Sequence, residues 1–200
     1  MIPKVLILLI LVTHGISDTC VRYTFDNDTE RVDNKFREFC ASMPFWNVGK
    51  YSDLDFHGQN DHSTSFITPQ PELSCMSTFV FPMNVGGTIE VNVYMEAVAP
   101  GDQIIVLAHQ SDISGDRVTG QAVTAAFDPN FVNGWHTLTI TLVGSETFDG
   151  YMTFLGSASP NSIVLVDSFR YIPPGMDERD CRLYEDRRIT NHPRFNHPRA

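Results

Sequence analysis

Three aspartates are the residues of this sequence whose side chains could hold a metal ion. Asp26 ends the first predicted strand, residues 22–26, Asp28 lies in the turn after it, and Asp167 lies inside the apolar run 163–169. Calcium in proteins prefers several hard oxygen ligands, and a carboxylate within an apolar strand requires a partner or a metal. The three aspartates are therefore candidate ligands for one structural calcium ion, and no other cofactor is indicated. The alternative leaves Asp167 facing solvent or hydrogen-bonded to the backbone.

Sequence motifs for catalysis are absent. The chain contains no G-x-S-x-G elbow, no H-E-x-x-H pair and no glycine-rich phosphate loop. His57, Asp61 and His62 lie close together in a polar stretch, but no second cluster of such residues accompanies them. We interpret these three as solvated loop residues. The sequence therefore indicates a binding protein and not an enzyme.

Residues 1–17 have the features of a signal peptide. A lysine lies near the start, residues 5–12 are apolar without interruption, and Gly15 and Ser17 are small residues before a cleavage point. The apolar run is shorter than the ~20 residues that span a bilayer, and no later stretch approaches that length. The sequence therefore predicts a secreted, extracellular protein without a membrane span.

Four cysteines follow the signal peptide: Cys20, Cys40, Cys75 and Cys181. In a secreted chain they predict two disulfides, for which three pairings are possible. None of them belongs to a C-x-x-C pair, so neither a zinc site nor thioredoxin-like chemistry is indicated. Asn27 begins the only N-x-S/T sequon and is a candidate glycosylation site.

The charge distribution argues against some partners. A net charge of −10 disfavours nucleic acid and anionic membranes as the main partner. Residues 182–200 differ from the rest because they are basic and poor in apolar side chains, and they carry an N-H-P-R near-repeat. This composition predicts a disordered tail.

Alternation of apolar and polar residues is the main structural signal. In residues 88–96 the two kinds alternate strictly, which is the period of a strand with one buried and one wet face. About nine short segments of this kind, separated by turn signals, predict an all-β domain over residues 18–181. A two-sheet β-sandwich with jelly-roll topology suits this strand number. Segments 75–81 and 88–96, joined across Gly86-Gly87, are expected to form a central hairpin.

The order of these residues resembles the MAM domain family. That family typically begins with a cysteine and an aromatic-acid pair, and continues with three further cysteines, two tryptophans and an acidic residue in the last strand. The matching residues are Cys20, Phe25-Asp26, Cys40, Trp46, Asp61-His62-Ser63, Cys75, Trp135, Asp167 and Cys181. The chain departs from the pattern where Ser168 replaces a second aspartate, and where the glycine-tryptophan pair beside the second cysteine is missing.

The resemblance implies a jelly-roll β-sandwich with Cys20–Cys40 and Cys75–Cys181 disulfides. It also implies an extracellular module that recognises another protein, often a second copy of itself. Related jelly rolls often hold a calcium ion between an acid of the first strand and an acid of the last, which here are Asp26 and Asp167.

We predict a secreted recognition or adhesion module that binds an extracellular protein, and a second copy of the chain, in a homo-oligomer, is one candidate partner. The alternative is a carbohydrate-binding jelly roll that binds a glycan. A sugar site requires exposed aromatic and polar side chains on a concave sheet face, and Tyr51, Tyr94 and Phe131 are the candidate aromatic residues. Trp46 and Trp135 are expected in the core.

Overall fold

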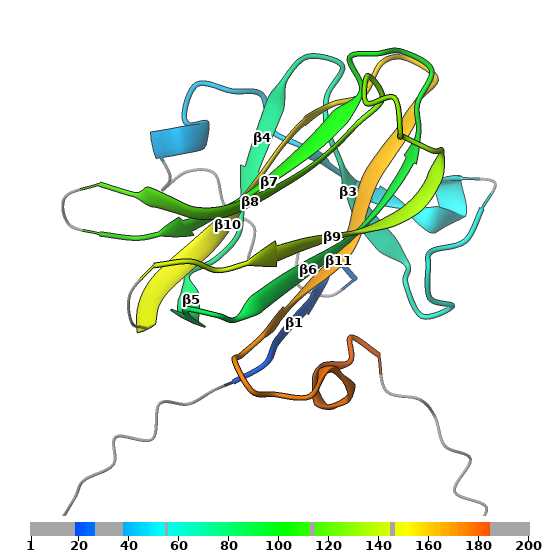
Figure 1. The fold of residues 1–200 in the computed structure, drawn as a ribbon. Coiled ribbons are helices and arrows are strands. Elements are labelled where there is room, and N and C mark those ends of the chain that lie inside the picture. Colours follow the sequence, from blue (N-terminus) through cyan, green and yellow to red (C-terminus); the bar gives the residue numbers. More distant parts are fainter. Residues whose placement is uncertain (1–18, 27–37, 55, 113–114, 145–146, 185–200) are drawn as a thin grey trace, which may run out of the picture.

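The structure is a computed structural model that describes residues 19–26, 38–54, 56–112, 115–144 and 147–184 (Figure 1). The predicted signal peptide, Asn27, Asp28 and residues 185–200 lie outside the described residues. Within these ranges the regular elements are strands and short 3-10 helices, which confirms the all-β prediction. No helix of the described part is long and apolar enough to cross a membrane.

The regular elements follow one another along the chain. The strands are β1 (Val21–Thr24), β2 (Asn47–Lys50), β3 (Ser65–Thr68), β4 (Ser74–Ser77), β5 (Phe81–Asn84), β6 (Thr88–Glu96), β7 (Gln103–Gln110), β8 (Arg117–Ala125), β9 (Gly134–Thr141), β10 (Thr147–Ser157) and β11 (Ile163–Ile172). The 3-10 helices are η2 (Glu38–Cys40), η3 (Tyr51–Asp53) and η4 (Glu178–Cys181).

The strands form two antiparallel sheets that pack face to face (Figure 1). The six-stranded sheet has the order β2-β3-β11-β6-β9, and β1 also pairs with β11. The five-stranded sheet has the order β4-β10-β7-β8, and β5 also pairs with β10. Because β6 follows one edge of β11 throughout, β1 and β3 share the other edge. The jelly-roll β-sandwich confirms the predicted fold class.

The alternating segments place apolar side chains between the sheets. In β6, Ile89, Val91, Val93 and Met95 are fully buried, whereas the residues between them lie on the outer side. Trp46 is buried in the same core, as predicted. Burying each such side chain contributes about 1.5–3 kcal/mol, so the alternation fixes which face of the sheet points outward.

The predicted hairpin of residues 75–81 and 88–96 is wrong. The first segment divides between β4 and β5, which both pair with β10 in the five-stranded sheet. β6 lies in the other sheet, so the Gly86-Gly87 turn carries the chain across the sandwich. Gly86 has a φ of 82°, the left-handed conformation that glycine adopts without strain. The glycines do mark a turn, but the period of a strand does not identify its partner.

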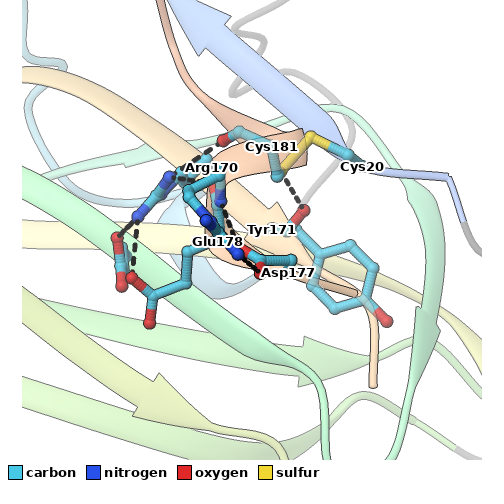
Figure 2. Close-up of a disulfide and its surroundings, with 8 residues drawn as sticks. Cys20, Arg170, Tyr171, Asp177, Glu178 and Cys181 are labelled. Atoms are coloured by element: carbon cyan, nitrogen blue, oxygen red, sulfur yellow. Dashed lines mark hydrogen bonds and ion pairs between the residues drawn. A yellow bond between two sulfur atoms is a disulfide. The ribbon is translucent and has the colours of Figure 1, made fainter. Parts of the chain in front are cut away.

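The disulfides join Cys20 to Cys181 and Cys40 to Cys75, so the pairing implied by the MAM resemblance is wrong. Cys20 directly precedes β1, which runs antiparallel to β11. The chain leaving β11 turns back and brings Cys181 to Cys20 (Figure 2). Cys75 lies in β4 of the other sheet, where η2 supplies Cys40. Membership of the MAM family stays a prediction.

Residues 173–184, here called the C-terminal strap, follow β11 and contain η4. The strap reaches past Cys181 as far as Tyr184, whose hydroxyl lies 2.5 Å from Ser63 Oγ. Leu183 and Tyr184 are half-buried. Leu183 and Tyr184, which belong to the predicted tail of residues 182–200, therefore lie against the sandwich.

Candidate functional site on the outer face of the six-stranded sheet

A β-bulge in β11 turns two polar residues toward the outer face. The register between β11 and β6 shifts between Val166 and Ser168, so Asp167 is an extra residue in the strand. The core positions Val166 and Phe169 are consequently three residues apart instead of two. Bulges of this kind re-aim side chains and are over-represented beside functional sites. Asp167 and Ser168 are both almost completely buried and need polar partners.

These partners form a continuous chain of hydrogen bonds across the sheet. The Thr137 hydroxyl of β9 donates to Asn92 Oδ1 of β6 at 3.0 Å, and Asn92 Nδ2 donates to Ser168 Oγ at 3.2 Å. The Ser168 hydroxyl donates to Asp167 Oδ2 at 2.7 Å. The Tyr51 hydroxyl of η3 donates to Asp167 Oδ1 at 2.8 Å. This row of hydrogen bonds gives the buried carboxylate of Asp167 its partners and holds the Asn92 amide in one orientation.

A pocket of about 300 Å³ lies above this chain, and we call it the strand pocket. Three strands of the sheet and two irregular segments line it. Its lining residues are Gln59, Asn60, Glu90, Asn92, Thr137, Asp167, Arg170, Leu183 and Tyr184. Most of these side chains carry hydrogen-bond donors or acceptors, so the pocket is suited to a polar ligand.

Arg170 is fully engaged with protein groups at the edge of the strand pocket (Figure 2). Its Nε and Nη2 lie 2.7 and 2.6 Å from Glu90 Oε2. Its Nη1 donates to the backbone oxygens of Glu178 and Cys181 at 3.1 and 3.0 Å. Arg170 therefore ties the sheet to the C-terminal strap, and its charge is already paired with Glu90.

A second and larger pocket of about 740 Å³ lies among the loops, and we call it the loop pocket. Aromatic, hydroxyl and charged side chains line it together. They are Asp26, Lys50, Tyr51, Ser52, Leu54, Phe56, His57, Ser63, Thr64 and Ser65. Asp26 fixes part of this wall, because its Oδ1 accepts hydrogen bonds from the backbone amides of Thr64 and Ser65 at 2.7 and 2.8 Å.

Three aromatic rings lie beside the polar chain on the same outer face. Tyr94 and Trp135 are opposite each other in β6 and β9, one outward position beyond Asn92 and Thr137. The ring centroids of Phe56 and Tyr94 are 4.5 Å apart, and those of Tyr94 and Trp135 are 5.3 Å apart. All three side chains are half-buried. They offer apolar ring surface next to the polar floor.

The other predictions about aromatic residues have different outcomes. Trp135 does not lie in the core as predicted, because it occupies an outward position of β9. Tyr51 is only 5% exposed, and its hydroxyl serves Asp167 and not a ligand. Phe131 stacks on His136 and lines neither pocket. Of the three candidate aromatic residues, Tyr94 is the one that the structure brings to this face.

Two tyrosine hydroxyls of the site keep their protons at neutral pH. Burial, against the lowering effect of the Ser63 hydrogen bond and with a smaller contribution from the carboxylates of Asp167 and Asp26, raises the pKa of Tyr184 to about 12. Burial and the Asp167 carboxylate raise the pKa of Tyr51 more strongly. Tyr51 is therefore a permanent hydrogen-bond donor to Asp167.

The candidate calcium ligands have protein partners in the structure. Asp26 accepts hydrogen bonds from Thr64 and Ser65, and both oxygens of Asp167 accept hydroxyl hydrogen bonds. Within the described ranges no group of three or more His, Cys, Asp or Glu residues could hold a metal. Asp28 lies outside the described residues. A calcium ion between Asp26 and Asp167 stays a prediction, and the chain supplies both carboxylates with partners by itself.

The buried carboxylate of Asp102 is satisfied in the same way elsewhere in the molecule. It accepts hydrogen bonds from the Ala99 and Ser159 amides at 3.1 and 2.6 Å and from the Ser162 hydroxyl. Burial raises the pKa of Asp102, but these hydrogen bonds outweigh it and leave the pKa below its usual value. Protein donors alone therefore stabilise a buried carboxylate in this fold.

Sequence reasoning missed several residues of the site. The alternation of 88–96 and 135–142 does place Asn92 and Thr137 on the outer side of their strands. The three-residue spacing of Val166 and Phe169 was the available sign of the bulge. No local pattern indicates that Tyr184 packs against the sandwich.

Comparisons with known proteins find similar solved structures but no match by sequence. No protein-family profile matches the chain, and no curated protein sequence matches it. Among solved structures it is similar to a β-1,3-glucan-binding CBM6 from Bacillus halodurans, with 16% identity over 74% of this chain and 92% of that one, at a TM-score of 0.41. It is also similar to the K1 cleaved adhesin domain of Lys-gingipain from Porphyromonas gingivalis. The identity is 13% over 78% of this chain and 99% of that one, at a TM-score of 0.47. A third similar structure is TmCBM61 in complex with β-1,4-galactotriose, with 12% identity over 77% of this chain and 88% of that one, at a TM-score of 0.38.

Proposed function

We propose that the protein is an extracellular glycan-binding module whose ligand lies on the outer face of the six-stranded sheet. The observation that carries this proposal is the ordered hydrogen-bond chain from Thr137 to Asp167, which lies beside the half-buried rings of Tyr94 and Trp135. Its two disulfides are compatible with an extracellular location.

The chemistry of this face is complementary to a sugar. A sugar ring presents hydroxyl groups at its edge and C–H groups on its faces. Asn92 and Glu90 supply amide and carboxylate groups to the edge, within the strand pocket. The Trp135 and Tyr94 rings supply apolar surface for the C–H groups. Because the hydrogen-bond chain already orients Asn92, little side-chain entropy is lost when a ligand binds.

The charges of the strand pocket favour a neutral glycan. Glu90 and Asp167 bring carboxylates to the lining, and the guanidinium of Arg170 is already paired with Glu90. The whole chain carries a net charge of −10. A uronic or sialic acid would therefore be repelled, and we expect neutral sugars to bind more tightly.

Recognition of another protein is the second candidate function, and a separate surface favours it. Val98, Phe127 and Val132 are 62%, 66% and 68% exposed on the β6–β7 and β8–β9 loops. These loops are joined by hydrogen bonds from Ala97 to Asn133 and from Ala126 to Asp102. Exposed apolar side chains on braced loops suit a protein interface, for an unrelated partner or a second copy.

The test compares one aromatic residue on each of the two surfaces. We expect neutral β-linked oligosaccharides to bind the full chain in isothermal titration calorimetry, and Trp135→Ala to weaken binding about tenfold or more. Phe127→Ala is the matched control, because Phe127 is exposed but lines neither pocket, and it should leave the affinity unchanged. Thermal unfolding confirms that both variants are folded.

Two outcomes contradict the proposal. One is the absence of binding to any neutral glycan of a broad array. The other is an affinity that Trp135→Ala leaves intact. Self-association that Phe127→Ala abolishes, measured by sedimentation velocity, would favour protein recognition instead.

A further inference from the structure

The strand pocket and the loop pocket are separated by two hydrogen-bonded bridges. In each bridge one residue lines the loop pocket and the other lines the strand pocket. Tyr51 donates to Asp167 at 2.8 Å in the first bridge. Ser63 and Tyr184 lie 2.5 Å apart in the second. The two pockets are therefore neighbours with a common partition.

The two bridges differ in how firmly the fold holds them. Tyr51 and Asp167 are 5% and 1% exposed, and the apolar side chains of Phe66 and Leu165 pack beside Tyr51. Tyr184 is half-buried, belongs to no strand or helix, and follows the anchoring residue Cys181 by only three positions. The first bridge is part of the sandwich, whereas the second depends on the end of the strap.

Tyr184 also closes one end of the strand pocket. Leu183 and Tyr184 are the lining residues that the strap contributes, and the Tyr184 ring lies 6.2 Å from the His62 ring in the loop that carries Ser63. A pocket of about 300 Å³ is at the lower end of the ~300–1,000 Å³ range of small-molecule sites. With Tyr184 in place, a ligand of the strand pocket cannot continue into the loop pocket on this side.

We propose that Tyr184 determines how long a glycan the protein binds, and this inference rests on the proposed function. With Tyr184 docked on Ser63, the site takes a short glycan in the strand pocket. When Tyr184 is displaced, the Tyr51–Asp167 bridge remains, but the two pockets connect on the Tyr184 side and the loop pocket becomes a further subsite. The hydroxyls of Ser52, Ser63, Thr64 and Ser65 then line the path of additional sugar units.

The test measures affinity as a function of ligand length. The probes are neutral β-linked gluco- and galacto-oligosaccharides of about two to six units, titrated into the full chain by calorimetry. For the native protein we expect the affinity to level off at the shortest lengths. For Tyr184→Ala we expect it to rise about tenfold over the same series, which corresponds to ~1.4 kcal/mol.

Two further variants keep the test specific. Tyr184→Phe retains the ring but loses the hydrogen bond to Ser63, so it should show an intermediate length dependence. Arg182→Ala is the matched control, because Arg182 is an exposed strap residue that lines neither pocket. It should behave as the native protein. If Tyr184→Ala lowers the melting temperature strongly, Tyr184→Phe carries the comparison.

The outcomes separate this inference from the proposed function. An identical length dependence in the native protein and in both Tyr184 variants overturns the role of Tyr184 and leaves glycan binding intact. Failure of every variant and of the native protein to bind any glycan overturns both.

Discussion

On the six-stranded sheet the outer face of β6, β9 and β11 carries a row of hydrogen-bonded polar side chains beside aromatic rings, whereas the outer face of the five-stranded sheet carries a cluster of apolar side chains. Leu107 and Leu155 pack there against Ile105 and Met43, next to the Cys40–Cys75 disulfide. Each face is covered by an irregular segment that a disulfide holds in place. The C-terminal strap covers the first face, and the segment following η2 covers the second.

The side chains of each face determine how the segment that covers it is held in place. On the five-stranded sheet, apolar side chains from the segment and the strands exclude water and extend the core. On the six-stranded sheet, the polar groups are satisfied by defined hydrogen bonds, and the strap is tied to them through Arg170 and Tyr184.

Removing each disulfide should give the largest effects and separate the two faces. In the chain-entropy model, Cys20→Ser with Cys181→Ser costs about 5 kcal/mol of unfolding free energy, and Cys40→Ser with Cys75→Ser about 4 kcal/mol. The order follows from sequence separations of 161 and 35 residues. Denaturant unfolding measures both. The dependence of glycan affinity on ligand length should change only in the first pair, because only that disulfide anchors the strap, and an equal change in both pairs would contradict the comparison.

Single substitutions should separate stability from binding at a smaller scale. Leu155→Ala is expected to lower the unfolding free energy by about 2–4 kcal/mol, because Leu155 is only 8% exposed, and to leave glycan affinity unchanged. Asn92→Ala is expected to cost about 1 kcal/mol, the value of a typical hydrogen bond. It should weaken glycan binding about tenfold. Urea unfolding and calorimetry on the same preparations measure both quantities. A tenfold loss of affinity in Leu155→Ala would contradict the comparison, because it would show that glycan binding also depends on the five-stranded sheet.

Alkaline pH should release the strap without unfolding the sandwich. The pKa of Tyr184 is raised to about 12 in the folded state, whereas an unperturbed tyrosine has a pKa of about 10. The docked strap is therefore fully stable below about pH 10, and its stability is lost as the pH rises toward 12. Absorbance at 295 nm of the native protein minus that of Tyr184→Phe gives this titration. A midpoint near 10 would show that Tyr184 is not docked.

Adding or removing calcium should have the smallest effect of the four changes considered. Asp26 and both oxygens of Asp167 already accept protein hydrogen bonds, so an added ion would have to displace some of them. We expect chelation to change the melting temperature by less than about 2 °C in differential scanning calorimetry. A rise of about 5 °C or more on adding millimolar calcium would instead establish a structural calcium site.

Local patterns in the sequence determined the class of the fold. The strict alternation of residues 88–96 is a property of one strand, and it correctly assigned Val91 and Asn92 to opposite faces. Pro69 directly follows β3, which ends at Thr68, and proline has no amide hydrogen for a sheet ladder. An aspartate within an apolar run correctly indicated that Asp167 needs a partner.

Only the tertiary structure decided which of these elements meet. Cys181 pairs with Cys20 because β1 lies beside β11, and β4 and β5 separate from β6 because both pair with β10. The partners of Asp167 come from Tyr51 and Ser168, one distant and one displaced by a bulge. The alternation of apolar and polar residues is a property of a single segment. Pairing depends on long-range competition among many similar strands, so it is settled only when the whole sandwich packs.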